Sequence, residues 1–262
     1  GATMQQLDEL ATRPYEEIVE DLLYPDRFTA VEEALLERYI GMDVEIGVYW
    51  MYRMISSPRQ LEEKISLFWH HVFATSRVKS EHVYSQHKQL EWFRQLGLSD
   101  MRSILTELSM DPAMLFYLDN NENIKGEPNE NYGRELLELF SMGIGNYTET
   151  DIKECARAFT GWTLYNAEYM EARSLKASIW PYGGIGWHYD YRDEDHDHGT
   201  KEFLGESGDF NGDDIIEIIC RNPATARFVA RHLYDFFVAD EAPVPQWPYV
   251  PPVDPEAIEI LA

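Results

Sequence analysis

Residues 111–162 read DPAMLFYLDNNENIKGEPNENYGRELLELFSMGIGNYTETDIKECARAFTGW and hold the clearest helix signals of the chain. Asp111 and Pro112 are typical of a helix start, because an aspartate caps the first free amides and proline suits the first helical position. A second start follows at Pro128, and Gly143 offers the left-handed conformation that ends many helices. We therefore expect a helix of about 13 residues between Pro128 and Gly143.

Helical periodicity continues outward from this stretch in both directions. Apolar residues recur at intervals of three and four between capping residues and glycine stops, which is typical of amphipathic helices. Besides the two starts above, helices are expected at residues 14–23, 29–40, 57–73, 80–96, 99–110, 148–161, 213–220 and 223–238.

The segment between Gly161 and Asn211 has a different character, because it is rich in Trp, Tyr, Gly and Asp and lacks a helical period. WTLYN, IGWHYDY and KEFLG are its best strand candidates on aromatic and β-branched content. The sequence thus predicts a mainly α, multi-helix globular domain with a small β-hairpin and loop insertion around 163–211. Residues 1–239 are expected to form this single domain, and 240–262 a proline-rich segment followed by the start of a truncated helix.

Composition limits the classes of protein that fit. The 262 residues include 47 acidic and 22 basic side chains, giving a formal net charge of -25. Such a surface repels polyanions, so nucleic acids and anionic membranes are not expected partners. No apolar run reaches the roughly 18 to 20 residues that a transmembrane helix needs. The two cysteines, Cys155 and Cys220, lie within expected helices, which favours buried free thiols over a disulfide framework.

The expected helix that opens with residues 128–131, here called the PNEN helix, separates polar from apolar residues. At about 100° per residue, its polar residues fill one arc opposite the apolar side. They are Glu130, Asn131, Arg134, Glu135 and Glu138. An exposed face with ion pairs four residues apart would have this pattern, each pair contributing roughly 0.2 to 0.5 kcal/mol. The alternative is a functional or buried network, in which the deeper glutamates bind metal or act as bases and the arginine holds a substrate anion.

Four phrases of the sequence together resemble a known bacterial family. DPAMLFYLDN, PNENYGRELLELFSMG, ARAFTGW and HDHGTKEFLG are similar to the core signature of the family described as domain of unknown function 1800. Because most members of that family are secreted or envelope proteins, the resemblance implies a secreted, periplasmic or cell-envelope location. Gly1-Ala2-Thr3 is similar to the end of the family's opening phrase, so the chain is expected to be an internal piece of a longer protein.

Histidines near the matched phrases are candidate metal ligands or proton-transfer groups. The family phrase F-W-H-x-H-F reads FWHHVF at residues 68–73, so Val72 occupies the second histidine position. This departure argues against a paired-histidine site unless His71 substitutes from a different direction. His196 and Asp197 match the family phrase H-D-x-G-x-K, although the acidic residues beside them are equally typical of a solvated loop.

The resemblance implies that the PNEN helix, the helix carrying His70 and the loop carrying His196 converge on one polar pocket. The candidate catalytic residues are Glu130, Arg134, Glu135 and His70. The candidate ligands for a divalent metal ion are His70, His196, Asp197 and Glu138. In the enzyme hypothesis these groups act in hydrolysis of an extracellular polymer, and the arginine orients the substrate. In the rival hypothesis they form a buried network in a secreted binding or assembly module that works with another secreted protein.

Overall fold

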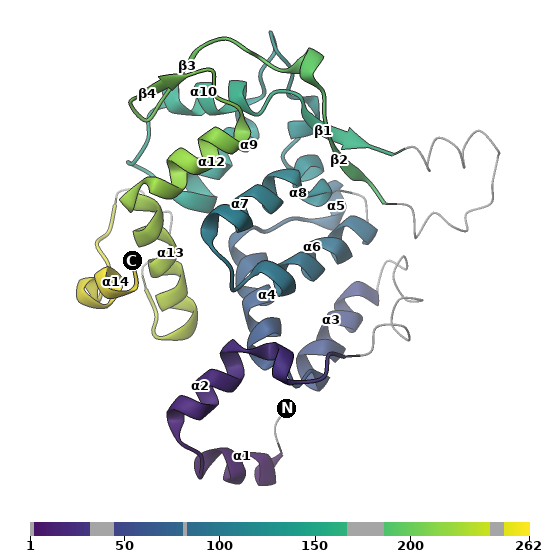
Figure 1. Ribbon diagram of the computed structural model, residues 1–262, viewed down its shortest axis with the longest axis vertical. Coiled ribbons are helices and arrows are strands. Elements are labelled where there is room, and N and C mark those ends of the chain that lie inside the picture. The colour runs from purple at the N-terminus through teal and green to yellow at the C-terminus, as the bar shows by residue number, and fades with distance from the viewer. Residues whose placement is uncertain (1–2, 32–44, 81–82, 167–185, 242–248) are drawn as a thin grey trace, which may run out of the picture.

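The computed structural model describes residues 3–31, 45–80, 83–166, 186–241 and 249–262, and it is mainly helical, which confirms the predicted fold class (Figure 1). The first half contains α1 (Met4–Ala11), α2 (Tyr15–Leu23), η1 (Pro25–Arg27), α3 (Glu45–Ser56), α4 (Gln60–Val72), α5 (Arg77–Ser80), α6 (Val83–Leu96), α7 (Met101–Met110) and α8 (Pro112–Tyr117). The second half contains η3 (Asn120–Glu122), α9 (Glu130–Glu135), η4 (Leu136–Ser141), α10 (Glu149–Ala158), β1 (Trp162–Tyr165), β2 (His188–Tyr191), η6 (Asp193–Asp195), β3 (Lys201–Phe203), β4 (Glu206–Gly208), α12 (Gly212–Arg221), α13 (Pro223–Phe237) and α14 (Pro255–Leu261). None of the described helices combines the length and apolarity required to cross a membrane.

Most of the expected helices are present in this arrangement. The segments 57–73, 99–110 and 223–238 correspond to α4, α7 and α13, and the segment expected at 80–96 is α6, preceded by the separate short helix α5. The helix expected at 29–40 lies mostly outside the described residues. Helix α3 was not expected, because apolar residues occur on both of its faces and no single stripe stands out from the sequence.

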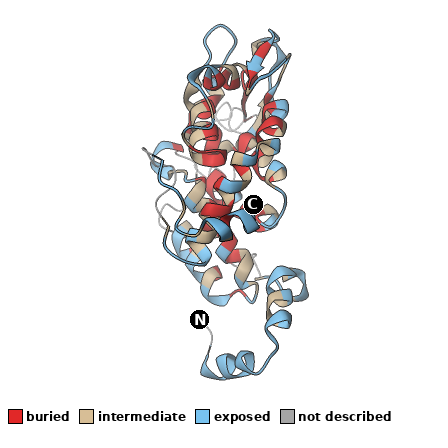
Figure 2. Ribbon diagram, turned by 90° about the vertical axis from the view of Figure 1, so that its left-hand side faces the viewer, coloured by how far each residue is buried: buried red, intermediate tan, exposed pale blue. Residues whose placement is uncertain are grey.

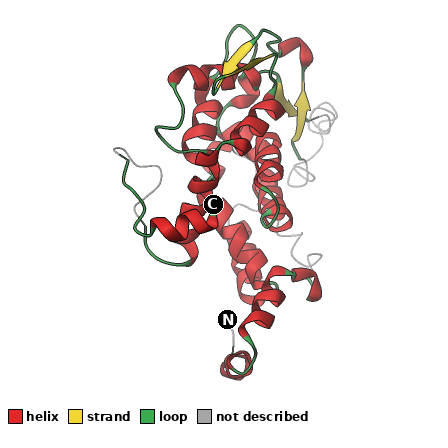
Figure 3. Cartoon of the chain, turned by 60° about the vertical axis from the view of Figure 1, so that its left-hand side comes forward, coloured by secondary structure: helices red, strands yellow, loops and turns green. Residues whose placement is uncertain are grey.

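Two antiparallel hairpins make up the predicted β insertion. Strand β1 pairs with β2 in the register Trp162↔Tyr191 to Tyr165↔His188. Strand β3 pairs with β4, which the sequence patterns did not indicate. Figure 3 shows both hairpins at the end of the molecule opposite the N terminus. Residues 167–185 of the insertion lie outside the described residues.

Aromatic side chains connect the helices of the core, which occupies the body of the molecule (Figure 2). Phe73 meets Phe140 edge-on, with ring centroids 5.5 Å apart. Phe159 contacts the rings of Tyr132 and Trp162 at centroid distances of 5.1 and 5.0 Å. Such edge-to-face pairs add about 0.5 to 1.5 kcal/mol each beyond the burial of their apolar area. They tie α4 to η4, and α9 to α10 and β1.

Capping aspartates mark the starts of α7 and α8, and the second lies at the bend that the Asp-Pro signal predicted. Asp100 accepts a hydrogen bond from the Ser103 amide at 3.0 Å, and Asp111 accepts one from the Met114 amide at 3.0 Å. Asp111 is buried and also accepts a hydrogen bond from Gln89 Nε2 at 2.5 Å. Burial raises the pKa of Asp111 to about 7. The same carboxyl group therefore joins α6 to the start of α8.

Gly161 forms the junction between α10 and β1. Its φ of +80° lies in the left-handed region. Its amide donates to the Asn123 carbonyl at 3.0 Å, and its carbonyl accepts from the Arg192 amide at 2.9 Å. A Cβ added here would lie 2.5 Å from the carbonyl oxygen of Arg192. Both the backbone angle and the available space therefore require glycine.

We expect Gly161→Ala to lower the free energy of unfolding by roughly 2 to 4 kcal/mol, because left-handed strain and a backbone clash act together. Gly145→Ala is the matched control, since its φ is +93° but no atom lies within 4 Å of the added Cβ. The control should lose only about 1 kcal/mol through backbone strain. Urea unfolding of both variants measures the difference, and equal losses would contradict the clash.

Candidate functional site

The PNEN helix begins and ends where the sequence predicted, but it is not a regular α-helix. Asn129 caps it by accepting a hydrogen bond from the Asn131 amide at 3.0 Å. After α9 the chain continues as the π-helical turn η4, and the amides of Met142 and Gly143 both donate to the Leu137 carbonyl, at 3.1 and 3.0 Å. The wider π turn changes the angular spacing of the residues that follow it. Such turns are rare in proteins overall, but those that occur are often found at functional sites.

The predicted polar arc is consequently divided into parts with different neighbours. Arg134 donates to both carboxylate oxygens of Glu149, at 3.0 and 2.8 Å, and its Nη2 lies 3.4 Å from Glu130. The ion pair expected between Glu130 and Arg134 is therefore present. Glu138, within the π turn, accepts a hydrogen bond from the hydroxyl of Tyr147 at 3.0 Å. These groups connect the PNEN helix to the start of α10 and to the loop before it.

The loop that carries His196 and Asp197 packs on the C-terminal end of α10. His196 is buried, and its Nδ1 lies 2.8 Å from the Thr160 carbonyl oxygen. Arg157 donates to both carboxylate oxygens of Asp197, at 2.7 and 3.2 Å. Lys201 is buried as well and donates to the Asp197 carbonyl. These groups satisfy one another and hold the loop against α10.

His70 has a third, separate environment on α4. Its ring centroid lies 5.2 Å from that of Trp50 and 6.5 Å from that of Phe93. Burial lowers the pKa of His70, which favours the uncharged imidazole. The four predicted metal ligands thus have different surroundings: aromatic rings for His70, α10 for His196 and Asp197, and a tyrosine for Glu138. Within the described ranges no three His, Cys, Asp or Glu side chains are grouped so that they could hold a metal ion.

One cavity does bring α4 and the PNEN helix together. It has a volume of about 480 Å³ and is here called the histidine–glutamate cavity. Its lining residues are His71, Val72, Ala74, Lys79, Tyr117, Leu118, Asn131, Glu135, Leu139, Phe140 and His232. Helix α4 contributes His71 to this lining rather than His70. Helix α13 contributes His232, whereas the loop that carries His196 contributes no lining residue. Of the predicted catalytic residues, only Glu135 lines this cavity.

Local geometry explains which side chains reach the cavity. Asn131 and Glu135 are four residues apart and share one side of α9. The Asn131 Nδ2 donates to the Leu118 carbonyl at 3.1 Å, which orients the amide. His71 lies in the last turn of α4, and His232 lies on α13, which packs against η4. The cavity therefore forms where three helices meet.

Two residues of the cavity, Glu135 and His232, have pKa values shifted in opposite directions. Burial and the nearby Glu138 raise the pKa of Glu135, and no hydrogen bond contributes to this shift. Burial, and then the neighbouring His71, lower the pKa of His232 to about 4. Its Nε2 is buried without a hydrogen-bond partner in the described part of the chain, an arrangement that costs about 1 to 3 kcal/mol. At neutral pH the His232 imidazole is uncharged.

One lining residue of the cavity, Lys79, pairs with a strained aspartate. Asp119 has a φ of +57°, in the left-handed region, and its carboxylate pairs with Lys79 Nζ at 2.8 Å. Asn129 Nδ2 donates to the Asp119 carbonyl at 3.1 Å, so the cap of the PNEN helix also holds this backbone. Strained residues cluster at functional sites. The ion pair thus connects the strained Asp119 to a residue that lines the cavity.

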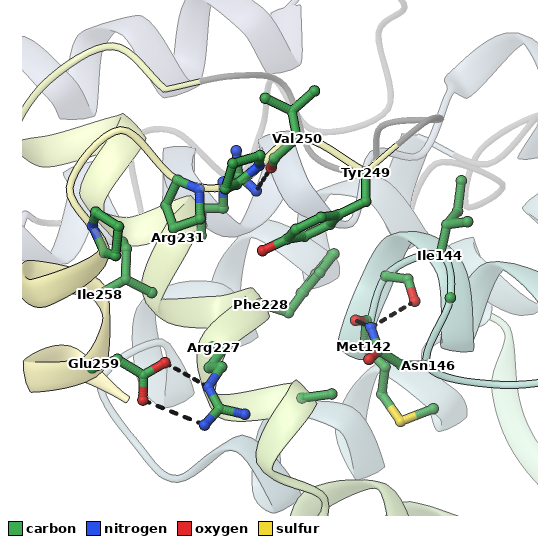
Figure 4. A pocket seen from close by; sticks show the side chains of 16 residues that line it. Met142, Ile144, Asn146, Arg227, Phe228, Arg231, Tyr249, Val250, Ile258 and Glu259 are labelled. Carbon is green, nitrogen blue, oxygen red and sulfur yellow. Dashed lines mark hydrogen bonds and ion pairs between the residues drawn. The ribbon is translucent and has the colours of Figure 1, made fainter.

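A larger cavity, of about 640 Å³, lies between α13, α14 and the loop after η4 (Figure 4). Its lining is mainly apolar, and its charged groups already have partners. Arg227 donates to Glu259 at 2.6 and 3.3 Å, and Arg231 donates to the Val250 carbonyl at 2.7 Å. In the histidine–glutamate cavity, by contrast, the Glu135 carboxyl group and the His232 Nε2 have no hydrogen-bond partner among the described residues, so this cavity is the better candidate site.

The family model described as protein of unknown function (DUF1800) matches residues 1–250. The chain belongs to this family. The resemblance seen in the motifs is thereby confirmed, and the match covers every residue that lines the histidine–glutamate cavity. No curated protein and no solved structure matches the chain.

His232 is the cavity residue that the motifs of this DUF1800 chain did not reveal. It follows Phe228 by one helical turn, and the two rings lie 4.5 Å apart. This spacing on the apolar side of α13 is the pattern of a core residue. Only the packing of α13 against η4 brings His232 to the same cavity as Glu135.

A pH-dependent contribution to stability is expected from Asp197. Its hydrogen bonds with Arg157 lower its pKa to about 2, below the ordinary value of 3.8, so the stabilisation is present above pH 4 and is lost as pH falls towards 2. Because both partners are partly exposed, we expect about 1 kcal/mol. Urea unfolding of wild type and Asp197→Asn should show a difference at pH 6 that shrinks at pH 2.5. A difference that does not change with pH would contradict this account.

Proposed function

We propose that the histidine–glutamate cavity is an acid–base active site and that the protein hydrolyses an extracellular polymer as a secreted or envelope protein. The observation that carries the proposal is that Glu135, His71 and His232 line one cavity of about 480 Å³. The secreted or envelope location is supported by the family resemblance alone. The cavity also offers apolar surface and a cation, Lys79, for holding a substrate.

The proposed chemistry requires one proton donor and one acceptor. An imidazole of His71 or His232 takes a proton from water as the oxygen attacks the electrophilic atom of the substrate. Glu135, whose raised pKa favours the protonated form, gives its proton to the leaving oxygen or nitrogen as the old bond breaks. These shifts favour a protonated Glu135 and an uncharged His232, which are the forms that the two roles require.

Metal chemistry at the predicted set of His70, His196, Asp197 and Glu138 is not part of this proposal, because these side chains lie in different surroundings. Arg134 is likewise occupied by Glu149 and Glu130. We assign a structural role to these residues. Proton transfer is assigned to the groups that line the cavity. Elemental analysis of protein purified without chelator tests the assignment, and stoichiometric metal that is lost in His196→Ala would overturn it.

We expect Glu135→Gln to reduce kcat by about 100- to 10,000-fold on whichever substrate class is hydrolysed, with little change in KM, because the variant keeps the shape but loses the proton. The measurement uses panels of chromogenic esters, chromogenic glycosides and peptides. Glu130→Gln is the matched control, since this carboxylate lies on the same helix but pairs with Arg134 and does not line the cavity. The control should retain activity within about three-fold.

Equal losses in the two variants would indicate damage to the helix rather than loss of a proton donor. Full activity in Glu135→Gln would remove this residue from the mechanism. Both results are distinguished from misfolding by the thermal unfolding of each variant.

A binding or assembly module is the second candidate function. It is favoured by the polar groups outside the cavity, which are hydrogen-bonded to one another and tie helices together. Under this hypothesis the wild type hydrolyses none of the panel but co-sediments with an insoluble polysaccharide or captures another secreted protein. Glu135→Gln would then change affinity without any catalytic readout.

A further inference from the structure

The cavity between α13, α14 and the loop after η4, here called the α13–α14 cavity, has no part in the proposed acid–base chemistry. Its volume of about 640 Å³ lies within the roughly 300 to 1,000 Å³ of small-molecule sites. One side is formed by the buried side chains of Met142, Phe228 and Ile258. The other side is formed by residues 249–255, here called the strap, which supply Tyr249 and several prolines.

A buried ion pair holds the strap in place over α13. The side chains of Arg231 and Glu241 are 9% and 0% exposed and pair at 3.1 Å. Arg231 Nη1 donates to the Val250 carbonyl at 2.7 Å, and the Val253 amide donates to Glu241 Oε1 at 2.6 Å. The pair thus binds the backbone on both sides of the two prolines between these residues. The strap is therefore a preformed wall of the cavity, as small-molecule sites require.

The charged side chains that line the cavity suit one anionic group. They are Arg227, Arg231 and Glu259, which give the lining a formal charge of +1, whereas the whole chain has a charge of -25. Arg231 is already bound by Glu241 and by the Val250 carbonyl. Arg227 is consequently the cation that a ligand can reach.

Arg227 has one edge of its guanidinium group occupied and another open. Its Nε and Nη2 donate to the two carboxylate oxygens of Glu259, at 2.6 and 3.3 Å. Glu259 is its only hydrogen-bond partner in the part of the chain that the structure describes, and Nη1 lies on the side away from it (Figure 4). The fork of a guanidinium group suits carboxylates. A ligand carboxylate can therefore bind the open edge while Glu259 stays in place.

Water weakens the repulsion between Glu259 and a second carboxylate at this position. The side chains of Arg227 and Glu259 are 54% and 59% exposed, so their charges interact in a high dielectric. The same exposure places the charged group at the open end of the cavity. An anionic head bound there keeps part of its hydration while its apolar body enters the cavity.

Tyr249 offers apolar surface beside this charged end. Its ring lines the cavity, yet the residue is 70% exposed. In Figure 4 the ring lies between Ile144 on one side and Ile258 on the other. An aliphatic chain that lies along the ring would remove apolar surface of both partners from water.

We propose that the α13–α14 cavity binds a fatty carboxylate, with the hydrocarbon chain between Phe228 and the strap and the carboxylate on Arg227. An uncharged apolar ligand would make no use of the open edge of Arg227. A polyanion would be repelled by Glu259 and by the acidic chain as a whole. The proposal concerns a binding site separate from the histidine–glutamate cavity and is independent of the proposed acid–base activity.

Isothermal titration of the full chain with decanoate, dodecanoate and 1-decanol at pH 8 tests the proposal. We expect one decanoate per chain, and an affinity for decanoate about 10-fold higher than for 1-decanol, because the carboxylate forms charge-assisted hydrogen bonds. Dodecanoate should bind more tightly than decanoate by up to about 15-fold, since it buries two further CH₂ groups.

Arg227→Gln should lower the affinity for decanoate to that for 1-decanol and leave the affinity for 1-decanol unchanged. Arg221→Gln is the matched control, because Arg221 forms a similarly exposed ion pair with Glu206 outside the cavity. A preference for decanoate that survives Arg227→Gln, or equal affinities of the wild type for the two ligands, would overturn the assignment of the carboxylate.

Ala224→Trp and Ile144→Trp each place a large ring in the cavity and should weaken the binding of all three ligands by at least about 100-fold. The two changes come from different walls, and thermal unfolding shows which variant keeps its fold. Binding that a folded tryptophan variant leaves unchanged would indicate adsorption elsewhere on the protein and would overturn the site. The absence of saturable binding to the wild type would do the same.

Discussion

Helix α9 lies directly on the backbone of α10 at Gly133, and the arrangement of the candidate site depends on this contact. A Cβ at Gly133 would lie 3.1 Å from the Ile152 carbonyl oxygen and 3.2 Å from the Ala156 amide nitrogen. A Cβ here would press on the α10 backbone, so glycine favours the close approach of the two helices. With this side of α9 held by α10, Arg134 reaches the start of α10, while Glu135 reaches the cavity shared with α4 and α13.

The π turn after α9 separates two carboxylates that a regular helix would keep together. Glu135 precedes the turn and lines the cavity, whereas Glu138 lies within it and binds Tyr147. The two groups nevertheless remain electrostatically coupled, because the charge of Glu138 contributes to the raised pKa of Glu135. A structural hydrogen bond on one side of the helix thus influences the protonation of a candidate catalytic group on the other side.

Local chemistry explains why the helix boundaries could be predicted and the cavity could not. Caps and stops such as Asp111, Thr148 and Gly143 act on amides and carbonyls within a few residues, so a single sequence contains their signals. The choice between His70 and His71 depends instead on which neighbours pack against each side of α4. The sequence prediction assumed 100° per residue throughout the PNEN helix. It therefore could not show the π turn, and the polar arc appeared continuous. His232 belongs to a distant helix, and its spacing is that of a core residue.

Perturbed protonation alone does not identify the site. Asp111 has a pKa raised to about 7, yet Gln89 and the Met114 amide satisfy its carboxyl group, and it lines neither cavity. His232 differs, because its buried Nε2 has no hydrogen-bond partner among the described residues. An unmet polar group lowers stability and persists only where other contacts hold it in place. Unmet hydrogen-bonding capacity beside a cavity, rather than the size of a pKa shift, is therefore the feature that makes this cavity the candidate site.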